Sequence, residues 1–95
     1  MKDIQKLSDW DEITRGLYRF HVLDNLDLEI HVVFHNRETD ILTSKCRIYI
    51  VGEYKGLGNA AFFERGFLMV GPLAACLEKA KLYNADIHMV RKEAD

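Results

Sequence analysis

The feature that most constrains this chain is a regular alternation of apolar and polar residues between positions 17 and 50. Successive side chains of a β-strand point to opposite faces, so alternation of this length predicts strands with one apolar and one polar face. We predict three strands, at about 17–23, 26–35 and 41–54, joined as an antiparallel meander. The apolar face would carry Tyr18, Phe20, Val22, Leu26, Leu28, Ile30, Val32, Phe34, Cys46, Ile48 and Ile50.

The pairing of the first two strands can also be predicted. A three-residue hairpin loop at 23–25 places Phe20 opposite Leu28 on the apolar face and Arg19 opposite Glu29 on the polar face. A two-residue loop would slip the pairing by one position and turn apolar groups to water. We therefore expect the three-residue loop.

A turn centred on Glu38 extends the meander to the third strand. It places Glu29 opposite Arg47, Asp27 opposite Tyr49 and Lys45 opposite His31. The predicted polar sheet face then has a cross-strand row of opposite charges, and its candidate functional residues are Arg19, Glu29, Arg47 and Tyr49. Cross-strand pairs of this kind contribute roughly 0.2–1 kcal/mol each, so the row mainly specifies register.

Helices are predicted before and after the meander in the sequence. Ser8 and Asp11 form a capping box, which predicts a short helix at 9–15 that ends at Gly16. After the meander we predict helices at 59–70 and 72–84, which cover the apolar face of the sheet. A strand at 66–70 is an alternative to the first of these helices, and residues 86–91 are a candidate last strand.

Length and composition place the chain among α+β proteins with one domain, residues 1–95. With 48% hydrophobic residues it has enough apolar material for a core. Thirteen Lys and Arg are interleaved with 15 Asp and Glu, so nucleic acid is not expected as a partner. Membrane association is not expected either, and we expect a cytoplasmic protein, since the sequence has no long apolar run and no signal-peptide pattern. Cys46 and Cys76 have no metal-ligand spacing and are interpreted as buried thiols.

No constellation in the sequence predicts catalysis or metal binding. His31 and His35 share the polar face with Asp27 and Glu29, but side chains along one strand face diverge instead of converging on a cation. The series His21, Asp27 and Tyr49 resembles a proton relay, yet an open sheet face provides no cleft around it. We therefore expect no catalytic residue and no metal site, and a non-enzymatic protein is the preferred interpretation.

The segment at 55–60 is the candidate ligand-binding loop, with Lys55, Gly56, Gly58, Asn59 and Ala60 as its binding residues. A glycine loop between a strand and a helix can present backbone N–H groups to a pyrophosphate. Lys55, Gly58 and Ala60 resemble the (Arg/Gln)-x-x-Gly-x-(Gly/Ala) loop of GNAT-type N-acetyltransferases, which implies CoA binding and acyl transfer. A simple structural turn is the other interpretation, and under it no cofactor is expected.

The last candidate is an interface made by Phe62, Phe63, Phe67 and Met69, because the segment 62–70 is apolar almost all round. From it we predict a small non-enzymatic binding or regulatory protein that acts by protein–protein association and forms homo-oligomers. Inhibitors and accessory proteins of phages or mobile elements are of this type. The alternative function is a CoA- or nucleotide-binding protein, or a minimal GNAT-like acyltransferase, that uses Lys55–Ala60.

Overall fold

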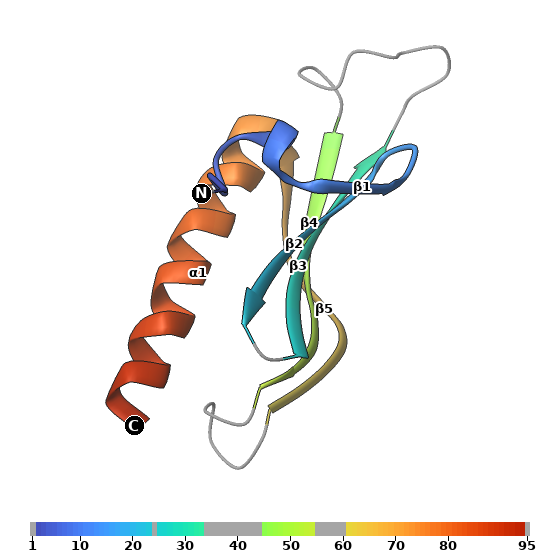
Figure 1. The fold of residues 1–95 in the computed structure, drawn as a ribbon. Coiled ribbons are helices and arrows are strands. Elements are labelled where there is room, and N and C mark those ends of the chain that lie inside the picture. The colour runs from blue at the N-terminus through green and yellow to red at the C-terminus, as the bar shows by residue number, and fades with distance from the viewer. Residues whose placement is uncertain (1, 24, 34–44, 55–60, 95) are drawn as a thin grey trace.

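The computed structural model of the chain describes residues 2–23, 25–33, 45–54 and 61–94. In this part of the chain a short N-terminal 3₁₀ helix precedes five strands, and an α-helix follows them (Figure 1). The elements are η1 (Leu7–Asp9), β1 (Asp11–Thr14), β2 (Leu17–Leu23), β3 (Asn25–Val33), β4 (Lys45–Tyr54), β5 (Ala61–Pro72) and α1 (Leu73–Ala94).

The five strands form one antiparallel sheet in the order β1-β2-β3-β4-β5. Each strand therefore pairs with its neighbour in the sequence, as in a meander. The predicted α+β class is confirmed, and the three predicted strands correspond to β2, β3 and β4. The prediction of only three strands was wrong, since β1 and β5 add one strand at each edge.

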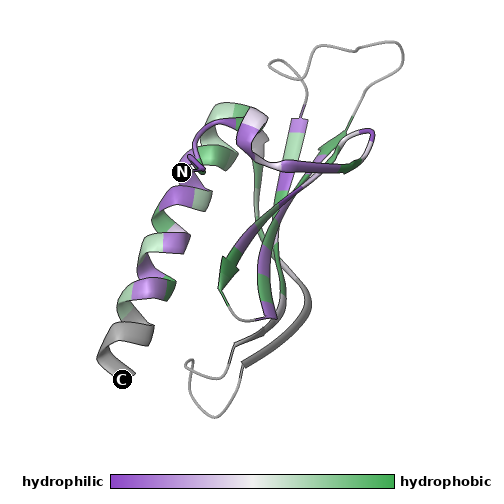
Figure 2. Ribbon diagram, in the orientation of Figure 1, coloured by the Kyte–Doolittle hydropathy of each residue, from purple (hydrophilic) through white to green (hydrophobic). Residues whose placement is uncertain are grey.

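The core lies between one face of the sheet and α1. Side chains of β3 and β4 that alternate toward the helix are fully buried, and Leu73, Cys76, Ala80 and Ile87 of α1 pack against them. Figure 2 shows the corresponding alternation of apolar and polar residues along the strands. The buried strand residues in this cluster are Tyr18, Val22, Leu26, Leu28, Ile30, Val32, Cys46, Ile48 and Ile50, and Phe20 packs against them at its margin.

The pairing of β2 with β3 confirms most of the predicted register. Arg19 lies opposite Glu29, and Phe20 lies opposite Leu28. The end of the hairpin differs, because an irregularity between His21 and Leu23 sets Leu23, not Val22, opposite Leu26. The predicted three-residue loop is therefore wrong in detail.

The predicted register of β3 with β4 was wrong by two positions. Glu29 lies opposite Tyr49, not Arg47, and His31 lies opposite Arg47, not Lys45. A shift of two keeps every side chain on its own face, so the apolar pattern alone cannot detect it. The Glu38 turn on which the prediction was centred is outside the described residues.

The helix predicted at 9–15 is wrong. Residues 7–9 form η1, Asp11–Thr14 pairs with β2 as β1, and Gly16 adopts a positive φ of 84° in the turn between β1 and β2. Ser8 lies within η1 and Asp11 is the first residue of β1, so the predicted capping box does not start a helix. A seven-residue helix is marginal by itself, whereas the edge of β2 satisfies the backbone of β1.

The helix predicted at 59–70 is also wrong, and the strand alternative at 66–70 is correct in type. The whole of 61–72 is β5, which pairs with β4. The apolar run 67–70 does not alternate because an irregularity adds one residue where Ile48 faces Met69 and Tyr49 faces Phe67. Leu68 and Met69 both pack against the core as a result.

The C-terminal helix confirms the helix predicted at 72–84 and its place over the apolar face, but it is longer than predicted. It continues through Ala94, so the candidate strand at 86–91 is wrong. Ile87 continues the buried stripe one turn beyond Tyr83. No helix in the described residues is long and apolar enough to cross a membrane.

Gly52 is the glycine on which the β3–β4 pairing depends. Its φ is 117°, and a Cβ built on it would lie 1.8 Å from the carbonyl oxygen of Asn25. That oxygen belongs to the backbone of β3, so it cannot move aside without distorting the central strand. A side chain at position 52 therefore meets both an unfavourable φ and a backbone clash.

We predict that Gly52→Ala lowers the free energy of unfolding by at least roughly 1–3 kcal/mol, the usual range for local backbone strain. Urea denaturation would measure it. Gly71→Ala is the matched control, because the nearest atom to its added Cβ is the flexible Met69 Cε at 3.3 Å. Equal stability of the two variants would contradict the requirement for glycine at position 52.

Candidate functional site

The candidate site is the open face, which we define as the side of the sheet turned away from α1. Residues that alternate with the buried core residues point to this side, and no helix or strand of the described chain lies over it. Its described side chains include Arg19, His21, Asp27, Glu29, His31, Lys45, Arg47, Tyr49, Phe67 and Val70.

Glu29 is at the centre of the open face, in the middle of the central strand, and its side chain is fully buried. Its Oε2 accepts hydrogen bonds from Arg19 Nε at 3.0 Å and Arg19 Nη2 at 2.7 Å. Its Oε1 lies 3.0 Å from His31 Nε2. A buried carboxylate is costly unless it is paired and hydrogen-bonded, and these two neighbours meet that requirement.

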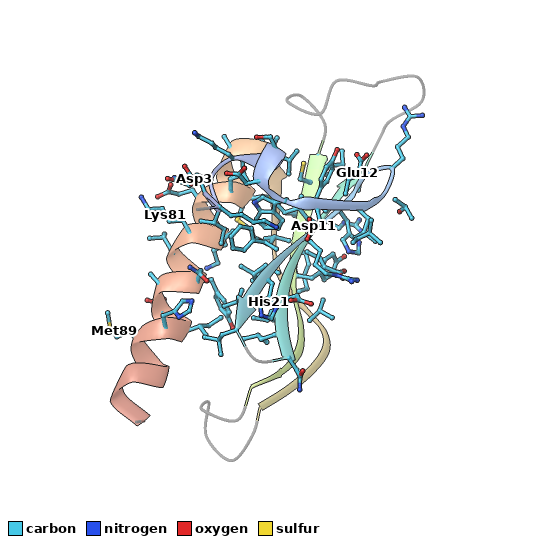
Figure 3. The ribbon with its side chains drawn as sticks, in the orientation of Figure 1. Asp3, Asp11, Glu12, His21, Lys81 and Met89 are labelled. Carbon is cyan, nitrogen blue, oxygen red and sulfur yellow. The ribbon has the colours of Figure 1, made fainter. Side chains whose placement is uncertain are left out.

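A second hydrogen-bonded pair, between a histidine and an aspartate, lies beside the first. His21 Nδ1 of β2 is 2.9 Å from Asp27 Oδ1 of β3, and His21 is labelled on β2 in Figure 3. The predicted proximity of His21 and Asp27 is confirmed. Tyr49 is not the third member, since Val51 lies opposite Asp27.

Three aromatic rings form a row across β3, β4 and β5. The centroid of the Tyr49 ring lies 4.5 Å from that of His31 and 5.7 Å from that of Phe67. Ring separations in this range are favourable contacts. Phe67 ends the row and keeps 57% of its surface exposed. Sequence reasoning missed this row because it placed Phe67 in a helix.

Two cations of β4 border the aromatic row. Arg47 lies opposite His31 and Val70, and Lys45 precedes it on the same side of the strand. Both side chains are exposed, and neither takes part in the ion pairs found in the described part of the chain. They differ in this from Arg19, whose guanidinium is occupied by Glu29.

The structure brings the predicted polar-face residues together in a modified arrangement. Arg19 and Glu29 pair as predicted, Tyr49 takes the position opposite Glu29, and Arg47 moves to His31. The burial of Glu29 was not foreseen. Its signal in the sequence was an acid at the centre of the middle strand with Arg and His as neighbours.

The predicted interface residues do not lie on one surface. Phe67 is exposed on the open face, while Met69 packs against the core on the opposite side. The side chains of Phe62 and Phe63 are outside the described part of the chain. So is the predicted ligand-binding loop, Lys55–Ala60, which stays a prediction, although the helix expected to follow it is β5.

The buried thiols have no arrangement suited to nucleophilic chemistry. Cys76 Sγ donates to the Cys46 carbonyl oxygen at 3.5 Å. Burial, with a smaller contribution from the charge of Cys46, raises the pKa of Cys76 to about 11. A reactive cysteine needs a lowered pKa and solvent access. Among the described residues, no three His, Cys, Asp or Glu side chains gather as metal ligands.

No family model, curated protein or solved structure shows significant similarity to this chain. Function is therefore inferred from the geometry of the open face and of the sheet edges.

We predict that Arg19→Met lowers the free energy of unfolding by roughly 2–4 kcal/mol, because it removes the main counter-charge of a buried carboxylate. Chemical denaturation at neutral pH would measure the change. Arg47→Met is the matched control on the same face and should stay within about 0.5 kcal/mol of the parent. The double variant Arg19→Met/Glu29→Met should recover much of the loss, and a failure to recover any of it would contradict this account.

We also predict an alkaline loss of stability that depends on Cys76. The native state keeps this thiol protonated up to about pH 11, whereas the unfolded chain ionises near the ordinary value of 9.0. The free energy of unfolding should be level below pH 9 and fall by about 2 kcal/mol between pH 9 and 11. Cys76→Ala should make this part of the pH profile shallower. An unchanged profile in the variant would assign the loss to other groups.

Proposed function

We propose that this chain is a non-enzymatic binding protein that associates with a second copy of itself through the edge of β5. The supporting observation is that β5 is the last strand of the sheet and carries exposed apolar side chains. Phe67 keeps 57% of its surface exposed and Val70 keeps 45%.

The contrast between the two edges of the sheet supports this choice. β1 is four residues long, all exposed, and it includes Asp11 and Glu12. Short, charged edge strands resist pairing with another chain. β5 has 12 residues, and its segment 66–71 has no charged residue. An uncharged edge segment of this kind presents backbone N–H and C=O groups that a further strand can pair with.

A second copy is the partner that the edge suits most simply. Two β5 strands related by a two-fold axis would pair antiparallel, and each copy would bury the same residues of the other. A module that works in this way acts by docking and suits a regulatory or inhibitory role. No catalytic residue is part of the proposal.

We predict that light scattering across a concentration series gives the mass of a dimer or higher oligomer. Val70→Lys should shift the protein to the monomer, since it puts a charge on the edge that must pair. Leu82→Lys is the matched control, because Leu82 is 54% exposed on α1 and is not part of β5 or of the core cluster. It should leave the mass unchanged.

Two results would count against association through β5. The first is a monomeric parent at every concentration tested. The second is an oligomer whose mass Val70→Lys leaves unchanged while circular dichroism shows the fold intact.

A further inference from the structure

We infer that the open face binds single-stranded nucleic acid, with the bases on the row His31–Tyr49–Phe67 and the phosphates on Arg47 and Lys45. The inference does not rest on self-association, but it shares Phe67 with that proposal, so binding and solution mass are measured together. Strand pairing would use the main chain of β5, whereas the Phe67 ring lies on the sheet face.

The aromatic row is the part of the open face that fits a base. Its three rings come from three adjacent strands, with centroid separations of 4.5 and 5.7 Å. Proteins that bind single strands stack successive bases on aromatic side chains, and each stacked base contributes roughly 1–3 kcal/mol. Phe67 is the most exposed ring and is the first position at which a base would stack.

The cations of β4 provide the matching charge. Arg47 and Lys45 precede Tyr49 on the same side of β4. Both are exposed, and neither has an ion pair in the described part of the chain. A phosphate backbone that lies along β4 would gain two contacts from them. Contacts of this kind make binding dependent on salt concentration.

The two acids in the middle of the open face, Glu29 and Asp27, are both hydrogen-bonded to neighbouring side chains. Glu29 is fully buried beneath its neighbours and is compensated by Arg19 and His31. Asp27 is paired with His21. Arg47 and Lys45 are therefore the exposed charged groups that the structure describes on the β4 side of the aromatic row, and the side chain of Asp27, 30% exposed, is hydrogen-bonded to His21.

The geometry favours single strands over duplexes. A sheet face presents rings that stack on unpaired bases, whereas the faces of bases in a duplex are already stacked on one another. Single-stranded DNA and RNA share this chemistry, and a test with both separates them.

The experiment is fluorescence anisotropy of labelled oligothymidylate, oligouridylate and a DNA duplex of equal length, titrated with the full chain at several salt concentrations. We expect saturable binding of at least one single strand, weaker binding as salt rises, and weaker binding of the duplex. Phe67→Ala should weaken binding about tenfold. Arg47→Ala should weaken it and reduce the salt slope by about one.

The matched control is Met89→Ala, which also removes a large exposed apolar side chain. Met89 is 59% exposed and points away from the sheet on α1 (Figure 3). It should bind like the parent. Light scattering at the titration concentrations shows whether any variant has changed its oligomeric state.

Three results would overturn the inference. These are no binding of any single strand at low salt, equal binding of duplex and single strand, and binding that neither Phe67→Ala nor Arg47→Ala weakens. If no probe binds and Phe67→Ala alters only the solution mass, the open face is part of a protein interface instead.

Discussion

A carboxylate that is buried away from water needs charged or hydrogen-bonding partners, and Glu29 is such a carboxylate at the centre of the sheet. It is fully buried in the middle strand, with Arg19 on one oxygen and His31 on the other. Arg19 reaches it from the position directly opposite Glu29 in the β2–β3 pairing. The same geometry holds the His31 ring against Tyr49, which begins the aromatic row. One buried charge thus links the register of the sheet to the composition of its open face.

The parts of the fold that the sequence predicts correctly are those that depend on alternation. A slip of one residue would put Phe20 in water, so the β2–β3 pairing was predictable. A slip of two residues exposes no apolar side chain, so the apolar pattern could not distinguish the two registers. The predicted β3–β4 register was wrong for this reason. Residues 11–14 and 61–72 are strands and not helices because the sheet edges offer them backbone partners. Local propensity cannot include that contribution.

The candidate site was predictable only in part, for the same reason. Arg19 and Glu29 were placed correctly because both belong to the well-determined hairpin. The aromatic row required β5 to be a strand, and Phe67 reached the open face through an irregularity at Leu68. An extra residue in a pairing changes the face of every later side chain, and nothing in the run 67–70 marks where it occurs.

The order of the elements along the chain has a consequence for folding. Every strand pairs with its sequence neighbour, so the sheet can be built up from hairpins of adjacent strands. The helix that covers the apolar face comes after all five strands. During synthesis all five strands are therefore made before the helix that covers them, and the apolar face with Leu28, Ile30 and Ile48 lacks its cover until α1 docks. That interval is when a growing chain of this topology is most open to aggregation and to capture by chaperones.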